Sequence, residues 1–305
     1  MASDPLKTSL GSIELTSPLI AASGTVGSVW EWATTADVRH FGAAVAKSVS
    51  AEPWAGRPVP RLAPISTGML NGIGIQNAGI EQWVGLMTSR IPGIEVSVWG
   101  SAVGHTPTEY AKVVVLLAEA GVPVVELNLS CPNLDDGEMF SFDPVRAAAV
   151  VEECAVVAPV PVGAKLSPDT PDLVAVASAC LEAGAGFLTL TNTASGFGMD
   201  RRTGRPLLSG GPGGYSGPGL KPIALRCVYQ VAQALPGAPI VGCGGISEAA
   251  DAVDFLMAGA SAVALGTVLL ESPNAGRRIA KDLVREMRRL GVSTVTELVG
   301  SVRPW

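Results

Sequence analysis

The chain has 305 residues, with 21 Lys and Arg against 27 Asp and Glu, for a net charge of −6. Its 48% hydrophobic and 16% charged residues exclude a disordered chain, and the absence of a basic excess argues against a nucleic-acid binder. Five cysteines without a Cys-x-x-Cys pair exclude a disulfide scaffold, and only two histidines, His40 and His105, argue against an imidazole metal site.

The uncharged stretch from Cys227 to Ser247 is long enough to cross a bilayer. It contains Pro236-Gly237 and a glycine cluster at 242–245, which favour a helix end, a turn and a strand instead. The N-terminal segment lacks the apolar core of a signal peptide. We therefore expect a cytoplasmic protein with reduced thiols and no membrane association.

Short apolar runs alternate with longer amphipathic runs along the chain. Most short runs are continuously apolar, as expected for parallel strands that are buried on both faces. The eight predicted strands are Pro18–Ala22, Ala43–Lys47, Glu95–Trp99, Pro123–Asn128, Pro161–Leu166, Gly186–Thr191, Pro239–Cys243 and Ser261–Gly266.

The runs between these strands carry helix signals. Thr106-Pro107 opens one helical run, with proline near the first helical position. Gly121, Gly184 and Gly259 each close another, where glycine can adopt the left-handed conformation of a helix end.

Alternating strands and helices imply a parallel sheet with right-handed crossovers. Eight repeats predict one closed (β/α)₈ barrel domain over residues 1–305, with a doubly wound open sheet as the alternative. Two insertions rich in glycine or proline are expected at about 50–77 and 195–219.

Polar residues follow several predicted strands at their carboxyl ends, where the active site of such a barrel lies. Asparagines and Cys131 follow the fourth strand, and Asn192 follows the sixth. The glycine turns after the seventh and eighth strands, Gly244-Gly245 and Gly266-Thr267, predict a phosphate site. Tight strand-to-helix turns are the alternative explanation for these glycines.

Cys131 lies between Asn128 and Asn133, and no histidine can be assigned to activate it. We therefore interpret it as a general base for an acidic C–H rather than as half of a Cys–His pair. A structural role is expected for the remaining cysteines. They are Cys154, Cys180 and Cys227 in helical runs, and Cys243 in a glycine turn.

Two lysines, Lys47 and Lys165, end apolar strands. An unpaired buried charge is costly, so we expect one to meet a carboxylate and the other an electron-rich ring. The alternative is that they extend to the surface. The alternating glycines of residues 68–77 predict a nest of backbone N–H groups for a small anion, although Asn-Gly is also an ordinary turn.

Sequence blocks along essentially the whole chain resemble the dihydroorotate dehydrogenases. They include GMLNGIGIQNAG at 68–79, ELNLSCPN at 126–133, GGYSGPGLKPIALR at 213–226 and GCGGI at 242–246. The resemblance implies an FMN-binding (β/α)₈ barrel that oxidises dihydroorotate to orotate in de novo pyrimidine biosynthesis. Cys131 falls on the catalytic base of the soluble, cysteine-containing class, which would remove the C5 proton while FMN accepts the C6 hydride.

The resemblance also implies binding roles, residue by residue. Substrate contacts fall on Lys47, Asn71, Ile73, Gly74, Ile75, Asn128, Asn133, Asn192 and Thr193. Flavin contacts fall on Ser23, Gly24, Lys47, Ser48, Asn128, Lys165, Thr191, Gly217, Gly244, Gly245, Gly266 and Thr267. We add Ser97 to the flavin contacts, as a replacement for the asparagine that the family carries near the end of its third strand.

The resemblance is closer to the class whose catalytic chain pairs with a second subunit carrying FAD and a [2Fe–2S] cluster and uses NAD. The other soluble class passes electrons to fumarate as a homodimer. This chain lacks the closely spaced cysteines that would hold a cluster. We therefore expect a separate electron-transfer subunit around a homodimeric core.

Three other functions remain as alternatives. A dihydropyrimidine dehydrogenase-like FMN reductase would share the barrel and the base, but its substrate lacks the carboxylate that Lys47 and the glycine nest favour. A flavin-free isomerase or aldolase would use Lys165 as a Schiff base on a phosphate-binding barrel. A degenerate barrel would serve only binding or assembly, and should show gaps among Cys131, the two lysines and the asparagines.

Overall fold

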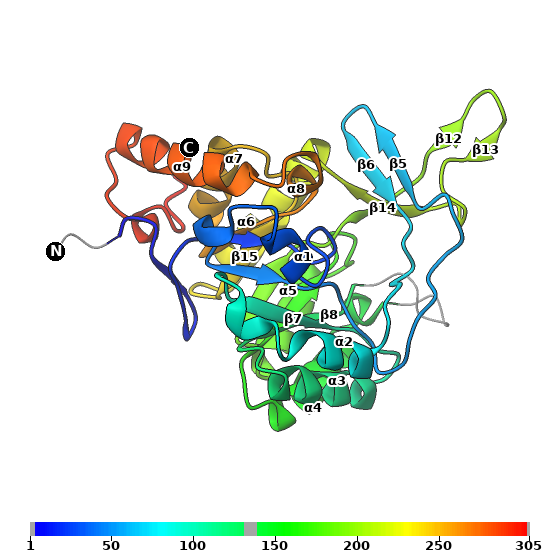
Figure 1. Ribbon diagram of the computed structural model, residues 1–305. Helices are drawn as coiled ribbons and strands as arrows, with labels where there is room; N and C mark the ends of the chain where they lie inside the picture. The colour runs from blue at the N-terminus through cyan, green and yellow to red at the C-terminus, as the bar shows by residue number, and fades with distance from the viewer. Residues whose placement is uncertain (1–3, 131–138, 304–305) are drawn as a thin grey trace.

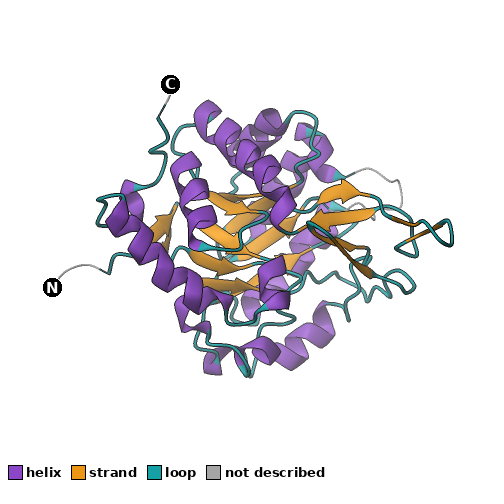
Figure 2. Cartoon of the chain, turned by 90° about the horizontal axis from the view of Figure 1, so that it is seen from above, coloured by secondary structure: helices purple, strands orange, loops and turns teal. Residues whose placement is uncertain are grey.

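The structure, a computed structural model, describes residues 4–130 and 139–303. Its central strands are β3 (Leu19–Ala21), β4 (Ala43–Val45), β7 (Val98–Ala102), β8 (Val125–Asn128), β9 (Val162–Leu166), β10 (Phe187–Leu190), β15 (Ile240–Cys243) and β16 (Ala262–Leu265). These eight parallel strands pair in chain order, and β16 pairs with β3 to close a barrel. Helices surround the strands (Figure 2). The predicted (β/α)₈ barrel is confirmed, and the open sheet is excluded.

The strand predictions overlap the observed strands, but the third is displaced along the chain. It was expected at Glu95–Trp99 and lies at Val98–Ala102. The physical reason is burial, because Glu95 and Ser97 are exposed whereas all five residues of β7 are buried. The carboxyl end of this strand is therefore near Ala102 rather than near Trp99.

The helices begin and end close to the predicted signals. They are α1 (Trp30–Ala33), α2 (Ile80–Met87), α3 (Pro107–Glu119), α4 (Pro144–Val157), α5 (Leu173–Glu182), α6 (Lys221–Ala234), α7 (Ala249–Ala258), α8 (Thr267–Glu271) and α9 (Ala275–Arg289). Short 3₁₀ turns lie at Val38–His40, Ile91–Gly93, Phe140–Phe142, Pro218–Leu220 and Val295–Glu297. Thr106 caps α3 by accepting a hydrogen bond from the backbone N–H of Glu109 (3.2 Å). Gly121 and Gly184 follow their helices with φ of +96° and +104°, as predicted.

Apolar side chains fill the interior of the barrel. Trp99 and Phe187 meet there with ring centroids 5.4 Å apart, beside Val124 and Val241. An N-terminal hairpin of β1 (Thr8–Leu10) and β2 (Ile13–Leu15) contributes Leu10 and Leu15 to the same cluster. The amino-terminal end of the barrel is thereby packed, which leaves the carboxyl end for a site. No helix within the described ranges is long and apolar enough to span a membrane.

The two predicted insertions meet in space and form a second sheet. It contains β5 (Leu62–Ile65), β6 (Gly68–Asn71), β11 (Ala194–Gly196) and β14 (Gly213–Ser216), paired antiparallel in the order β11-β14-β6-β5. The short strands β12 (Met199–Asp200) and β13 (Arg205–Pro206) extend from it. Figure 1 shows these strands projecting from one end of the barrel. We call this four-stranded sheet the flap sheet.

Candidate active site

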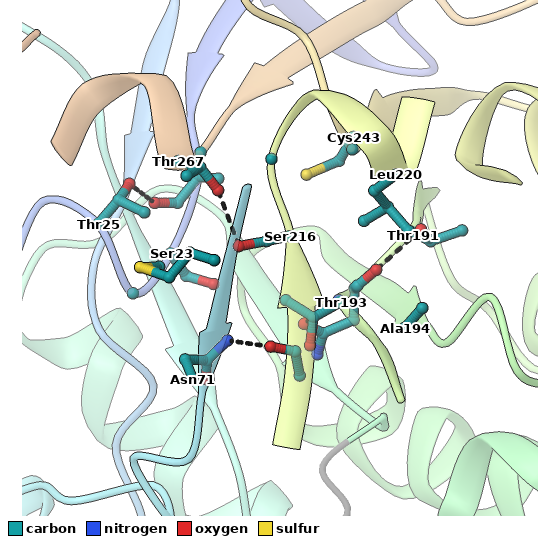
Figure 3. A pocket seen from close by; sticks show the side chains of 18 of the residues that line it. Ser23, Thr25, Asn71, Thr191, Thr193, Ala194, Ser216, Leu220, Cys243 and Thr267 are labelled. Atoms are coloured by element: carbon teal, nitrogen blue, oxygen red, sulfur yellow. Dashed lines mark hydrogen bonds between the residues drawn. The ribbon is translucent and has the colours of Figure 1, made fainter. Parts of the chain in front are cut away.

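A cavity of about 380 Å³ lies between the flap sheet and the carboxyl ends of the barrel strands (Figure 3). The structure brings most of the predicted site residues around it. They are Ser23, Gly24, Lys47, Ser48, Asn71, Ile73, Gly74, Ile75, Asn128, Lys165, Thr191, Asn192, Thr193, Gly217, Gly244, Gly245, Gly266 and Thr267. The predicted base Cys131 and the predicted substrate contact Asn133 lie outside the described residues.

Ser97 is the one described residue among the predicted site residues that does not line the cavity. It is exposed and precedes β7, so it lies at the amino-terminal end of that strand, away from the cavity. Because the strand begins three residues later than predicted, its carboxyl end carries Ser101 instead. Ser101 is fully buried, and its hydroxyl oxygen lies 2.9 Å from that of Ser48, which lines the cavity.

Three polar residues at the ends of β8 and β10 form a connected edge of the cavity, which we call the asparagine rim (Asn128, Ser130 and Asn192). Asn192 Nδ2 donates to Asn128 Oδ1 (3.2 Å) and to Ser130 Oγ (2.8 Å). Its Oδ1 accepts the backbone N–H of Thr193 (2.8 Å). Asn128 Nδ2 in turn donates to Ser48 Oγ (3.2 Å). These bonds hold both amides in fixed orientations before any ligand binds.

The segment after β6 carries the predicted anion nest. Asn71 Nδ2 donates to the carbonyl of Gly214 (3.2 Å), the bond drawn beside Asn71 in Figure 3. The backbone N–H of Gly72 already donates to the carbonyl of Arg61 (2.8 Å). The backbone N–H groups of this segment that are available to an anion are therefore those of residues 73–75. Ile75 has a φ of +56°, which is rare for a β-branched residue and points to a functional constraint on this turn.

The glycine turn after β15 is required by packing. A Cβ at Gly244 would lie 2.6 Å from the Cβ of Ala224, and one at Gly245 would lie 2.5 Å from the backbone nitrogen of Lys221. The close approach of this turn to the start of α6 therefore explains why both positions are glycine, without the need for a ligand. Gly266 after β16 differs, because a Cβ there would meet only Ala22, at 3.8 Å.

A buried ion pair lies at the base of the cavity. Lys165 Nζ is 3.3 Å from Glu126 Oε1, and both side chains are at most 5% exposed. Burial is the largest single influence and disfavours the charged lysine, but the charge of Glu126, its hydrogen bond to the lysine and the nearby Cys243 together raise the pKa of Lys165 above its ordinary value. The prediction that one lysine meets a carboxylate is confirmed. Glu126 itself was missed, although a carboxylate within an apolar strand was the available signal.

The described cysteines are buried thiols. Cys154, Cys180 and Cys227 lie in α4, α5 and α6, as predicted, and burial raises the pKa of Cys154 and of Cys180 to about 12. Cys243 ends β15 and lines the cavity. Burial raises its pKa, and the nearby charge of Lys165 offsets this only in part. These four thiols are therefore held in the protonated form near neutral pH.

Comparison with known proteins identifies the family. A sequence model described as dihydroorotate dehydrogenase matches residues 5–287. The chain belongs to the dihydroorotate dehydrogenase family. This family member is 40% identical over 295 residues to "dihydroorotate dehydrogenase B (NAD(+)), catalytic subunit" of Pelobacter propionicus, covering 96% of this chain and 97% of the relative.

Other relatives extend the comparison. A "putative dihydroorotate dehydrogenase A (fumarate)" of Solibacter usitatus is 41% identical to this chain over 300 residues. The alignment covers 98% of this chain and 98% of the relative. A solved structure of DHODH from Eimeria tenella in complex with ferulenol superposes with a TM-score of 0.82, covering 98% of this chain and 89% of that chain at 19% identity. This likeness supports the barrel fold, and enzymes of the family are flavoproteins.

Proposed function

We propose that this family member oxidises dihydroorotate to orotate, with FMN bound in the cavity. The observation that carries the proposal is the convergence on one cavity of a buried cation, an amide rim and a run of backbone N–H groups. The proposal is supported by the identity of about 40% over nearly the whole chain to relatives named as dihydroorotate dehydrogenases.

The described residues suit FMN. The cavity volume of about 380 Å³ is within the roughly 300–1,000 Å³ typical of ligand sites. The open space at Gly266, beside Thr267, suits the phosphate, and Ser23 and Thr191 offer polar contacts to a ring. Lys165 would stabilise negative charge on the reduced ring. When bound, FMN would accept the hydride from C6 of dihydroorotate.

Dihydroorotate has a carboxylate and amide-like ring edges, and the cavity offers matching groups for both. Lys47 and the backbone N–H groups of residues 73–75 suit the carboxylate. The side chains of Asn71 and the asparagine rim suit the ring edge. This pairing of a cation with a backbone nest favours dihydroorotate over a dihydropyrimidine, which lacks the carboxylate.

We propose Cys131 as the general base. Its thiolate would take the C5 proton, and the electron pair of that C–H bond would form the C5=C6 double bond as hydride leaves C6. Ser130, the described residue that precedes it, lines the cavity, which supports a role for the neighbouring thiol. None of the four described thiols replaces it, because burial disfavours their thiolate forms.

We further propose that electrons pass to NAD through a partner subunit that carries FAD and a [2Fe–2S] cluster, around a homodimeric core. Support comes from the relatives named catalytic subunits of NAD-linked enzymes. Fumarate is the alternative acceptor, supported by the relative named for it. Anaerobic reoxidation of the reduced single chain tests the choice, since rapid reoxidation by fumarate would overturn the NAD proposal.

The deciding experiment is an anaerobic visible spectrum of the purified chain before and after addition of dihydroorotate. Bleaching of an oxidised-flavin band is the expected result. A flavin band that dihydroorotate leaves unchanged would overturn the substrate assignment and favour the dihydropyrimidine alternative. A chain that binds no flavin after FMN is added would favour a flavin-free isomerase or aldolase.

A further inference from the structure

A buried polar layer separates the cavity from the apolar interior of the barrel. It consists of Glu126 on β8, Lys165 on β9, Thr189 on β10 and Ser23 after β3. The first three are 3%, 4% and 1% exposed. Thr189 is paired directly with Lys165 in the strand register. Three adjacent strands therefore contribute one inward-facing side chain each to the same layer.

The carboxylate of Glu126 is fully engaged in this layer. Its Oε1 accepts hydrogen bonds from Lys165 Nζ and from the Ser23 hydroxyl, both at 3.3 Å. Its Oε2 accepts one from the Thr189 hydroxyl at 2.8 Å. Lys165 Nζ also donates to Ser23 Oγ (3.2 Å). A buried ion pair needs such additional hydrogen bonds to offset the free-energy cost of removing both charges from water.

The two charged residues differ in what they reach. Lys165 and Ser23 line the cavity, whereas Glu126 and Thr189 are not among its lining residues. Within the described part of the chain, Glu126 is also the only carboxylate within ion-pair distance of Lys165. Any influence of Glu126 on a ligand is therefore transmitted through the lysine.

We propose that Glu126 is a positioning residue for Lys165, holding its ammonium group charged and fixed at the base of the cavity. The inference rests on the proposed function only for the identity of the group that Lys165 faces. A lysine without this carboxylate would be a buried charge beside an apolar interior and would lose its proton at a lower pH.

The other groups that act on Lys165 do not replace the carboxylate. Burial opposes the charged form, while Glu126 on β8 and Cys243 on β15 are the titratable groups that raise the pKa of the lysine. The thiol of Cys243 has a raised pKa itself, mainly through burial, and stays neutral near pH 7. Thr189 and Ser23 carry no charge. Among the residues that the structure describes, Glu126 alone therefore supplies negative charge beside Lys165 at neutral pH.

The pH dependence of unfolding separates positioning by charge from simple packing. In the wild type, the pKa of Lys165 is raised in the folded chain. The stability that the charged lysine contributes is therefore fully present below the pKa of lysine in the unfolded chain, about 10.4, and is lost only above it. Lys165 thus gives the free energy of unfolding no slope against pH between about pH 6 and 9. In Glu126→Gln, the folded pKa should fall below about 10.4, and stability should rise with pH.

The test is urea unfolding of the full chain between pH 6 and 9.5. For Glu126→Gln, we expect the unfolding equilibrium constant to fall by up to about tenfold per pH unit relative to the wild type, the limit for one proton. Glu126→Asp should restore the wild-type slope, and Glu126→Gln/Lys165→Met should abolish the new one. Glu119→Gln, an exposed change on α3, is the matched control.

A Glu126→Gln profile that matches Glu119→Gln would overturn the proposal, as would a slope that persists in the double variant. If Glu126→Gln is too unstable to purify, both Glu126→Asp and the double variant must still fold, and failure of either refutes a charge-based role. None of these measurements uses dihydroorotate, so failure of this inference is distinguishable from failure of the proposed function.

Discussion

Replacing Asn192 by aspartate tests whether the asparagine rim is held in one orientation for the substrate. The change keeps the shape of the side chain but replaces the donor Nδ2 by an oxygen. Ser130 can turn its hydroxyl to donate to the new carboxylate, but Asn128 Oδ1, 3.2 Å away, then faces a second acceptor. An acceptor left without its donor costs about 2 kcal/mol, which is about 30-fold in an equilibrium constant.

For a chain of 305 residues, about 2 kcal/mol corresponds to a fall in Tm of about 3 °C, at an unfolding entropy of about 2.1 cal/mol/K per residue. We expect that fall by calorimetry. Orotate binding should also weaken in isothermal titration at pH 7, because the new carboxylate repels an anionic ligand. Gln230→Glu, an exposed change of the same chemistry on α6, is the control. A lowered Tm with unchanged orotate affinity would show that Asn192 only braces the rim.

Three further predictions concern the predicted base Cys131, the buried thiols of Cys154 and Cys180, and Asp251 on α7. Cys131→Ala should retain bound flavin but slow its reduction by dihydroorotate by about 10²–10⁴-fold, as for other lost general bases. Stopped-flow absorbance measures this rate, and an unchanged rate would remove Cys131 from that role. Because burial raises the pKa of Cys154 and Cys180 to about 12, iodoacetamide at pH 8 should label them only after unfolding. Peptide mass spectrometry detects the adducts, and rapid labelling of the folded chain would contradict their burial. Burial opposes ionisation of Asp251, but hydrogen bonds from Lys221 and Ser247 lower its pKa. Its contribution is present above the unfolded value of about 3.9 and is lost as pH falls through the lowered one. Asp251→Asn should therefore lower the urea midpoint at pH 7, and this deficit should shrink below pH 4. Asp254→Asn, which removes the more exposed partner of Lys221, should have the smaller effect, and a constant deficit at all pH values would refute the assignment.

The barrel was predictable from sequence because its strands are buried on both faces and read as continuous apolar runs. The same rule misplaced the third strand. Ser97 interrupts the apolar pattern and is exposed, while the small buried residues Gly100 and Ser101 that belong to the strand gave no apolar signal. A shift of a few positions decides at which end of a barrel strand a residue lies. This error therefore placed Ser97, a predicted flavin contact, at the carboxyl end of the strand, whereas it lies at the amino-terminal end.

Pairing between distant segments could not be predicted in the same way. The sequence indicated two separate insertions, but their union into the flap sheet depends on strand pairing between Leu70 and Tyr215. The partners of Glu126 could likewise not be predicted, because a carboxylate within an apolar strand indicates a buried charge but not the groups that it meets. Its partners, Lys165 and Thr189, lie 39 and 63 residues away, and only barrel closure brings them together.

The flap sheet also bears on when the chain becomes able to bind ligands during synthesis. Its central pair joins Asn71 to Gly214 across 143 residues, and contacts of such long range form slowly because closing the long intervening loop costs conformational entropy. Thr267 follows the last barrel strand. Its hydroxyl donates a hydrogen bond to the hydroxyl of Ser216, the last residue of β14 in the flap sheet. A nascent chain emerging from the ribosome thus carries the paired strands β5 and β6 without β14 while the 143 residues that separate Asn71 from Gly214 are synthesised. The pocket is complete only when these distant segments have come together, and retention of a ligand therefore reports folding of the chain from Ala22 to Glu271, the first and last residues that line the cavity.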